Sequence, residues 1–135
     1  MQDINNFLFI ILGLGSIGKR HAEFLNTFKG ELICIDPNKE ARTWAENKFK
    51  NSAIVYSTIQ EASKQISSST NKKIGVISNW GTLHYKSTID LISLGVKNIY
   101  IEKPIANSLE AIDSLKKIDP NIKLIGGFQN RYTKI

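Results

Sequence analysis

Three glycines near the N-terminus stand at a spacing that suits the binding of a phosphate group. The sequence Gly-Leu-Gly-Ser-Ile-Gly, which begins at Gly13, fits the pattern G-x-G-x-x-G. It lies between an apolar run and a helix-period segment, in which apolar residues recur every three or four positions as on one face of a helix. In that setting Gly13 permits a tight turn, Gly15 lets a pyrophosphate approach the backbone, and Gly18 lets helix and strand pack closely. The first helical residues, Ser16 and Ile17, would add N–H donors and partial positive charge. The alternative is an unliganded glycine turn.

A carboxylate follows at the end of the next apolar run. Asp36 lies 18 residues after the third glycine, where an acid can accept hydrogen bonds from the hydroxyls of an adenosine ribose. Its charge would repel a 2′-phosphate, and Pro37-Asn38 offers no guanidinium to hold one, so the pattern favours NAD. Lys39 and Arg42 are close enough to keep NADP as the less favoured alternative. A simple helix cap is the other interpretation of Asp36.

Two further segments place polar side chains where apolar runs end. Residues 78–84 read Ser-Asn-Trp-Gly-Thr-Leu-His, and residues 102–104 read Glu-Lys-Pro. Lys103, held between an acid and a proline, is expected near the place where a nicotinamide would lie, although taken alone it is equally well explained as a surface lysine. Trp80 would either stack near the nicotinamide or simply cover the cleft.

These residues need strands and helices to position them, and the chain alternates apolar runs with helix-period segments. Strands are expected at Phe7–Leu12, Glu31–Ile35, Ala53–Tyr56, Lys73–Ser78, Asn98–Ile101 and Ile122–Gly126. Helices are expected from Ile17 to near Gly30, after the caps Asn38, Thr58 and Asn107, and from Leu83 to Gly95. Strict alternation predicts an α/β fold, a doubly wound parallel sheet of about six strands with helices on both faces, known as a Rossmann fold. Its ligand site is expected at the carboxyl ends of the strands.

Length and composition set wider limits. A chain of 135 residues is one domain or a piece of something larger, and 41% hydrophobic with 22% charged residues is ordinary for a soluble globular protein. The net charge of +6 is spread along the chain, and no aromatic interleaving accompanies the acid-free stretch from Ala62 to Ile89. Binding of nucleic acid is therefore not expected, whereas a weakly basic surface suits an anionic small ligand.

Other residue types exclude further classes. The one cysteine, Cys34, lies in an apolar run, so it is interpreted as a small buried hydrophobe and no disulfide framework is expected. His21 and His84 lie 63 positions apart without a Cys or Glu at ligand spacing, so no metal is expected. The apolar octet that begins at Phe7 has no Lys or Arg before it and is too short to span a membrane, so we expect a soluble, cytoplasmic protein.

Together these residues resemble a known family. The glycine loop, Asp36, Thr82-Leu83-His84, Glu102-Lys103-Pro104 and Gly127-Phe128-x-x-Arg131-Tyr132 occur in the order and spacing of the nucleotide-binding half of the glucose-fructose oxidoreductase, inositol dehydrogenase and MocA family. The resemblance covers essentially the whole chain. Its most specific part is the Glu-Lys-Pro tripeptide combined with the upstream histidine and the downstream Gly-Phe-x-x-Arg.

The resemblance implies an oxidoreductase that moves a hydride between a nicotinamide and a hydroxyl-bearing carbon, often on a sugar or cyclitol. Lys103 matches the family's catalytic lysine, which hydrogen-bonds the reacting oxygen and assists proton transfer. Glu102 would lie by the nicotinamide ribose, His84 would line the cofactor cleft, and Arg131 would lie near the substrate. The alternative for His84 is a packing or capping role at the start of a helix.

Two departures from the family stand out. Asn79-Trp80-Gly81 occupies the place where the family commonly has Thr-Pro-Asn, so the cofactor contacts of Asn79 and Trp80 would differ from the usual ones. The family's second, α+β domain, which supplies the substrate pocket, does not fit within this length. We therefore expect a nucleotide-binding domain over residues 1–126, with residues 127–135 as the exit of the last strand and the start of the absent domain.

Two functions follow from this comparison. Alone, the chain is expected to bind NAD and to turn over little, because the groups that orient a substrate are missing. The alternative is a stand-alone NAD(H)-sensing module that resembles the regulatory domains of potassium channels, which share the glycine loop but have no need of Glu102-Lys103-Pro104. Self-association into a homo-oligomer through the sheet face left open is a further expectation.

Overall fold

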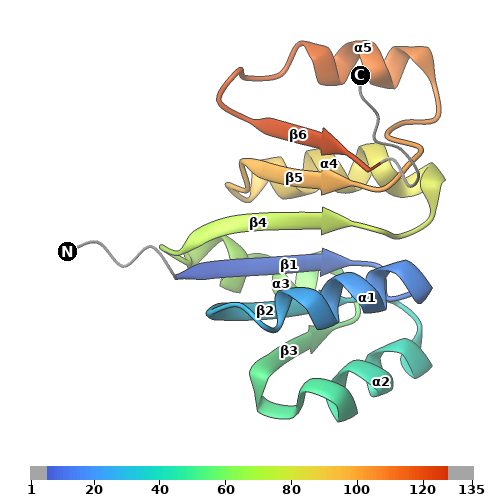
Figure 1. Cartoon of the computed structure of the whole chain (residues 1–135). Coiled ribbons are helices and arrows are strands. Elements are labelled where there is room, and N and C mark those ends of the chain that lie inside the picture. The colour runs from blue at the N-terminus through green and yellow to red at the C-terminus, as the bar shows by residue number, and fades with distance from the viewer. Residues whose placement is uncertain (1–5, 128–135) are drawn as a thin grey trace.

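Six parallel strands form the centre of the computed structural model, which describes residues 6–127 (Figure 1). The strands are β1 (Phe7–Leu12), β2 (Gly30–Ile35), β3 (Ala53–Tyr56), β4 (Lys72–Ile77), β5 (Asn98–Ile101) and β6 (Lys123–Gly126). Their order in the sheet is β3-β2-β1-β4-β5-β6, which is the order of a doubly wound Rossmann fold. The predicted fold class is confirmed, and each predicted strand agrees with the structure to within one residue at either end.

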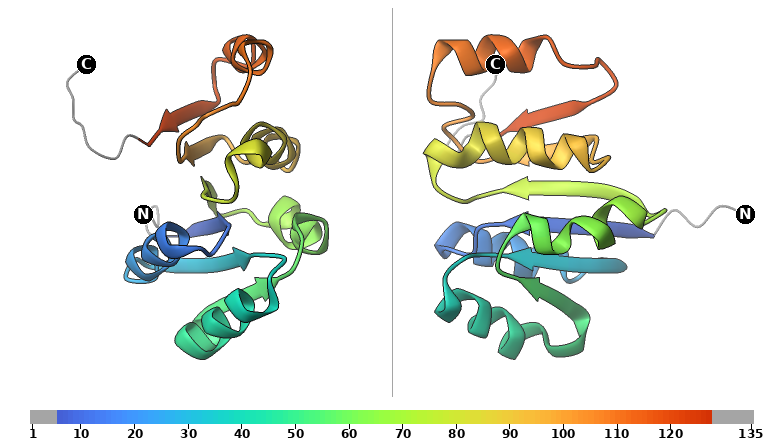
Figure 2. Two further views of the ribbon diagram at one scale, coloured as in Figure 1. Left: turned by 90° about the vertical axis from the view of Figure 1, so that its right-hand side faces the viewer. Right: turned by 180° about the vertical axis from the view of Figure 1, so that it is seen from behind.

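Helices cover both faces of this sheet. The α-helices are α1 (Ser16–Leu25), α2 (Lys39–Phe49), α3 (Ile59–Ser68), α4 (His84–Ser93) and α5 (Leu109–Lys116), and two short 3-10 turns are η1 (Lys50–Ser52) and η2 (Gly81–Leu83). Helices α1 and α2 pack on one face, and α3, α4 and α5 pack on the other (Figure 2). Among residues 6–127, no helix combines the length and the apolar character needed to cross a membrane.

The core explains why the strands read as continuous apolar runs. Along β1, Leu8 and Ile10 belong to the cluster under α3 and α4, whereas Phe9 and Ile11 belong to the cluster under α1 and α2. Successive side chains of a strand point to opposite faces, and both faces here are covered by helices. All four side chains are at most 3% exposed. Each contributes about 1.5–3 kcal/mol of burial free energy.

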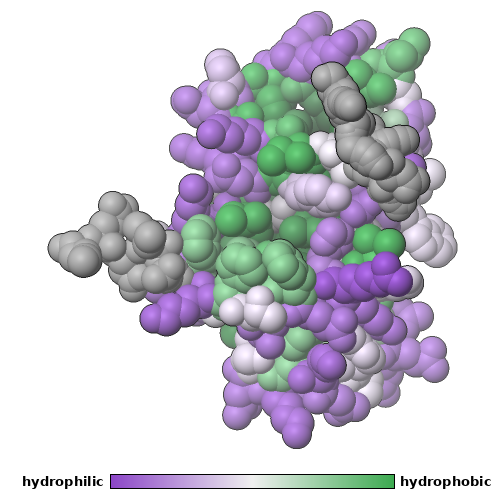
Figure 3. Space-filling model, in the orientation of Figure 1, coloured by the Kyte–Doolittle hydropathy of each residue, from purple (hydrophilic) through white to green (hydrophobic). Residues whose placement is uncertain are grey.

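One part of the sheet has no described helix over it. On the side of α1, Tyr100 of β5 packs at the edge of the core cluster, but no described helix covers β6, and Ile125 in β6 is 61% exposed. Phe24 and Phe28, near the end of α1, are 62% and 48% exposed. Figure 3 shows this side of the molecule, with apolar side chains gathered between α1 and β6.

Two helix boundaries differ from the sequence prediction. Helix α1 ends at Leu25 instead of near Gly30. Beyond it the backbone amides of Thr27 and Phe28 donate to carbonyls three residues back, which is the pattern of a turn, and the Thr27 hydroxyl also donates to the Phe24 carbonyl at 2.7 Å. Helix α5 is capped by Ser108 and not by Asn107. The Ser108 hydroxyl accepts a hydrogen bond from the backbone amide of Ala111, the third residue of the helix, at 3.0 Å.

Candidate functional site

A cavity of about 690 Å³ lies at the carboxyl ends of the central strands. The connections after β1 and β4 lead to opposite faces of the sheet, so the chain opens a crevice between them. The glycine loop after β1, residues 36–38 after β2 and residues 78–80 after β4 contribute to its wall. The ligand site predicted at these strand ends thus coincides with a cavity in the structure.

The three glycines of the loop have three different surroundings. Gly13 has a φ of +99°, and a Cβ there would lie 2.5 Å from the backbone nitrogen of Asn79. A Cβ on Gly18 would overlap the carbonyl oxygen of Gly13 and lie 2.8 Å from the Ser78 hydroxyl. A Cβ on Gly15 would meet nothing within 4 Å. The fold itself therefore requires the first and third glycines, whereas the second faces open space on the cavity wall.

Helix α1 begins at this loop without a protein cap. Gly15 is its N-cap and makes no side-chain hydrogen bond, and the first turn carries no acid. In contrast, α2, α3 and α5 begin with capping side chains and an acid in the first turn. The amides of Ser16, Ile17 and Gly18 are the first three of the helix and have no carbonyl partner within it. Together with the helix dipole, they suit an anionic group.

Asp36 closes the glycine loop as well as lining the cavity. One carboxylate oxygen accepts from the Leu14 amide at 2.7 Å, and the other accepts from the Asn38 amide at 2.8 Å. Because a carboxylate has about four lone-pair sites, two of them remain for a ligand hydroxyl. The helix-cap interpretation fits less well, since Asn38 caps α2 by accepting from the Ala41 amide at 3.0 Å.

The guanidinium of Arg42 is occupied within the protein. Its Nη1 donates to the backbone carbonyls of Asp36 at 3.0 Å and Pro37 at 2.7 Å. The Arg42 side chain therefore stabilises the turn after β2. Glu40, in the first turn of α2, lines the same cavity, so two carboxylates stand where a 2′-phosphate would need positive charge.

The residues after β4 include an unpaired buried oxygen. Asn79 is one of the residues that line the cavity, and its Nδ2 donates to the Ser87 hydroxyl at 2.9 Å. Its Oδ1 is buried and has no hydrogen-bond partner in the part of the chain that the structure describes. Leaving such an acceptor unpaired costs about 1–3 kcal/mol. A ligand donor in the cavity would relieve this cost, so the arrangement fits a polar ligand.

A second group of polar residues lies beside the cavity at the end of β5. Glu102 continues β5, donating its amide to the Ile77 carbonyl at 2.9 Å, and its carboxylate lies 2.8 Å from Nε2 of His21 on α1. The Tyr100 ring packs edge-on against His21 with centroids 5.3 Å apart. Burial, and then the charge and hydrogen bond of Glu102, raise the pKa of Tyr100.

Sequence reasoning did not select His21 or Tyr100 for the site. His21 falls within the apolar stripe of α1, which also contains Ala22 and Leu25. A polar side chain in an apolar stripe is the signal that would have marked it.

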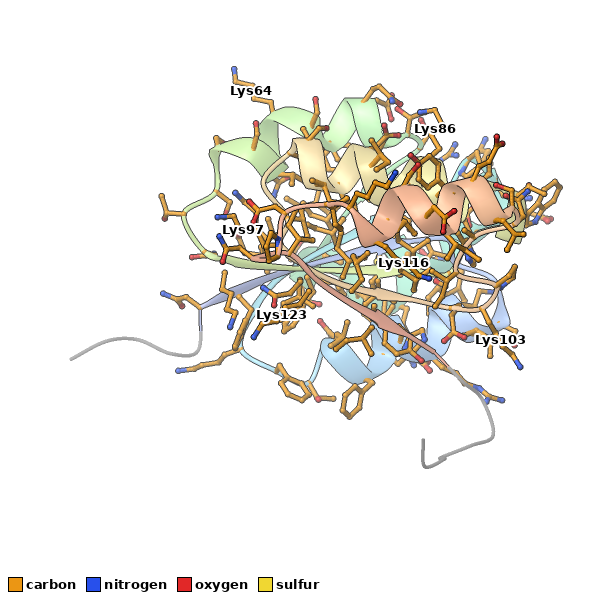
Figure 4. The ribbon with its side chains drawn as sticks, turned by 90° about the horizontal axis from the view of Figure 1, so that it is seen from above. Lys64, Lys86, Lys97, Lys103, Lys116 and Lys123 are labelled. Atoms are coloured by element: carbon orange, nitrogen blue, oxygen red, sulfur yellow. The ribbon has the colours of Figure 1, made fainter. Side chains whose placement is uncertain are left out.

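Lys103 stands at the same end of the sheet, exposed, and is joined to Pro104 by a cis peptide bond. Figure 4 shows it at the opposite end of the sheet from Lys97 and Lys123, which lie by the amino ends of β5 and β6. Lys103 therefore lies at the carboxyl ends of the strands.

His84 is a buried residue at the start of α4. It was predicted to line the cofactor cleft, but it is only 1% exposed and does not line the cavity. Its Nδ1 lies 2.6 Å from the Pro104 carbonyl and its Nε2 lies 2.8 Å from the Asn79 carbonyl. His84 therefore ties the loop after β4 to the loop after β5 from beneath, which agrees with the alternative packing interpretation.

The predicted site residues thus fall into groups. Gly13, Gly15, Asp36, Asn79 and Trp80 line the cavity; Ser16, Ile17 and Gly18 form the adjoining turn of α1; Glu102 and Lys103 lie at the end of β5; and Arg131 lies outside the described residues. Within residues 6–127, no three His, Cys, Asp or Glu side chains gather in a way that could hold a metal ion.

The sequence profile of the Gfo/Idh/MocA group, described as an oxidoreductase family with an NAD-binding Rossmann fold, matches residues 7–121. The chain belongs to this family. The resemblance predicted from the sequence motifs is thereby confirmed, and residues 7–121 correspond to the family's NAD-binding Rossmann domain. Among curated protein sequences there is no significant match.

Solved structures of other proteins show the same fold. The WlbA (WbpB) dehydrogenase from Thermus thermophilus, solved in complex with NAD and alpha-ketoglutarate, is 21% identical with a TM-score of 0.72, and the match covers 89% of this chain and 40% of that one. A Gfo/Idh/MocA family oxidoreductase from Vibrio cholerae is 16% identical with a TM-score of 0.73, covering 90% of this chain and 38% of that one. The chain therefore spans less than half the length of these proteins.

Proposed function

We propose that this chain binds NAD, in preference to NADP, as the nucleotide-binding part of an oxidoreductase that acts on a hydroxyl-bearing carbon of a sugar, cyclitol or similar substrate. The observation that carries the proposal is the cavity wall on which Gly15 faces open space beside the uncapped start of α1. Because Asp36 lines the same cavity, a phosphate position and a ribose position occur together.

The donors and acceptors of the cavity fit a dinucleotide. The amides at the start of α1 would hold the pyrophosphate, the carboxylate of Asp36 would accept from the adenosine ribose, and Oδ1 of Asn79 would accept from a donor on the ligand. When bound, the nicotinamide supplies the hydride chemistry that no amino-acid side chain offers.

The residues at the end of β5 would act on the substrate side. The exposed Lys103 would hydrogen-bond the reacting oxygen of the substrate and carry its proton. Glu102 is held against α1 by its contact with His21 at 2.8 Å, which fixes the backbone from which Lys103 extends. Since the chain spans at most 40% of the length of the two solved relatives, we expect little turnover by this chain alone.

The preference for NAD rests on the charges around the turn after β2. Asp36 and Glu40 both line the cavity, so a 2′-phosphate would meet two carboxylates. Arg42, the nearest guanidinium in the sequence, donates to two backbone carbonyls instead.

The stand-alone sensor remains the alternative function, but the structure gives it less support. A sensor needs the glycine loop and Asp36, and it has no need of an ordered segment around Lys103. The His21–Glu102 contact and the close contacts of His84 with the carbonyls of Pro104 and Asn79 both organise that segment. These contacts favour the oxidoreductase hypothesis.

Calorimetric titration of the chain with NADH and NADPH tests the proposal. We expect tighter binding of NADH, and we expect Asp36→Ala to raise the NADH dissociation constant by roughly 10- to 150-fold, the equivalent of a charged hydrogen bond of about 1.5–3 kcal/mol. Because Asp36 also holds the Leu14 amide, thermal unfolding must show that the variant is folded.

Glu46→Ala is the matched control, because it removes an exposed carboxylate from α2 that does not line the cavity. Its affinity for NADH should equal that of the unmodified chain. Tighter binding of NADPH than of NADH would refute the preference for NAD, and failure of both nucleotides to bind would refute the proposed function.

A further inference from the structure

Trp80 is an exposed aromatic side chain on the wall of the cavity. It is 80% exposed, and Leu83, which lines the same cavity, is 44% exposed. Tryptophan is on average a highly buried residue, and exposed apolar side chains that border a cavity mark a binding surface. The two side chains therefore offer an apolar contact to whatever enters the cavity.

The other residues of the cavity show which part of a dinucleotide would meet Trp80. Trp80 follows β4 and residues 36–38 follow β2, and these strands flank β1 on either side. Both segments line one cavity, whereas Glu102 and Lys103 do not line it. A carboxylate at the end of β2 binds the adenosine ribose, so this cavity takes the adenosine half. The base attached to that ribose lies between the two segments.

The backbone on both sides of Trp80 is held in place. The Trp80 carbonyl accepts from the Leu83 amide at 2.8 Å, and the Asn79 carbonyl lies 2.8 Å from Nε2 of the buried His84. A Cβ on Gly81 would lie 2.9 Å from Cδ of Pro104, so the loop packs closely against the segment after β5. Trp80 thus extends from a fixed backbone, which lowers the entropy lost on binding.

We infer that Trp80 is the stacking platform for the adenine ring, with Leu83 beside it and the turn at Pro37 on the other side of the base. This inference rests on the proposed function and adds to it a residue with a defined role. It assigns Trp80 to the adenine and not to the nicotinamide, which lies toward Glu102 and Lys103. Stacking requires only the π-face of the base, so the contact adds affinity without a hydrogen bond.

Fluorescence of a single tryptophan tests the assignment directly. The chain has two tryptophans, Trp44 and Trp80, and Trp44→Phe leaves Trp80 as the sole emitter while keeping an aromatic ring at position 44. This variant is titrated with NAD, ADP-ribose, AMP and nicotinamide mononucleotide. We expect the three adenine-containing ligands to change Trp80 emission and nicotinamide mononucleotide to leave it unchanged.

Calorimetry supplies a second readout. We expect Trp80→Ala to raise the dissociation constants of NAD and ADP-ribose by the same factor, about 5- to 150-fold, and Trp80→Phe to restore part of the affinity. Leu109→Ala is the matched control, because Leu109 on α5 is 79% exposed and does not line the cavity. Its affinity for NAD should not change.

The outcomes separate this inference from the proposed function. If NAD binds with unchanged Trp80 emission, or binds Trp80→Ala as tightly as the unmodified chain, the platform is refuted while the proposed function stands. A response to nicotinamide mononucleotide without one to ADP-ribose would assign Trp80 to the nicotinamide and also refute the inference. If calorimetry detects no binding of any of the four ligands to the unmodified chain, the proposed function itself fails.

Discussion

A substitution at Gly15, the second glycine of the loop, should change the affinity for NAD while leaving the stability of the fold nearly unchanged. Gly15 has a φ of −74° and a ψ of −164°, an extended conformation that alanine adopts without strain. A Cβ there would meet no protein atom within 4 Å. Replacing glycine by alanine at a compatible position stabilises a protein by about 0.4–1 kcal/mol, and alanine at a helix N-cap costs a similar amount relative to glycine.

Because these two effects offset one another, Gly15→Ala should leave the free energy of unfolding within about 0.5 kcal/mol of the unmodified chain. The new methyl group would occupy the open space that a pyrophosphate approaches. Crowding of this kind costs about 2 kcal/mol, which corresponds to a roughly 30-fold rise in the dissociation constant for NAD. Urea unfolding and calorimetric titration measure the two quantities on the same samples.

Gly18→Ala is the opposite case within the same loop. Its methyl group would overlap the Gly13 carbonyl oxygen, so helix α1 must shift, and we expect a loss of at least about 1–3 kcal/mol of stability. If Gly15→Ala binds NAD as the unmodified chain does, the cofactor does not pass over Gly15. If Gly15→Ala unfolds and Gly18→Ala does not, the steric reasoning is wrong.

Two further predictions concern buried groups. Burial raises the pKa of the Cys34 thiol to about 12 from an ordinary value of 9.0. The folded state therefore keeps this proton to a higher pH than the unfolded state does, and the free energy of unfolding should fall as the pH rises from about 9 to about 12. Urea unfolding at several alkaline pH values should show a shallower fall for Cys34→Ala, and parallel curves for the two proteins would contradict this. His84→Ala removes a buried ring whose two nitrogens contact the carbonyls of Pro104 and Asn79, and it should lower the free energy of unfolding by about 2–5 kcal/mol in the same assay. His21→Ala removes a partly exposed contact with Glu102 and should lower it by less than about 1 kcal/mol. A loss for His84→Ala no larger than the loss for His21→Ala would contradict this reasoning.

The sheet and most helix starts could be predicted because they depend on local patterns. A strand buried on both faces reads as an apolar run, as β1 does, and a capping side chain such as Asn38 marks the residue where a helix begins. The parallel pairing of the strands followed from the strict alternation of the elements. The loop glycines could also be placed, because their roles depend on spacing and on the strand-turn-helix setting.

Residues that act through distant partners could not be predicted in this way. The contact of His21 with Glu102 spans 81 positions, and the bond of His84 to the Pro104 carbonyl spans 20. No local sequence pattern around either histidine indicates which distant residue it contacts. The dual role of Asp36 was hidden for the same reason, since its bond to the Leu14 amide forms only when β1 and β2 lie side by side.

The contacts of His84 with two backbone carbonyls have a consequence for exchanging loops between relatives. They join the loop after β4 to the loop after β5, and the close approach of Gly81 to Pro104 adds a steric contact between the same two segments. A chimera that replaces residues 79–81 with the family's more common Thr-Pro-Asn would therefore place a side chain at position 81, where glycine now packs against Pro104. The two loops should therefore be exchanged together, because a graft that moves both keeps the contacts between them.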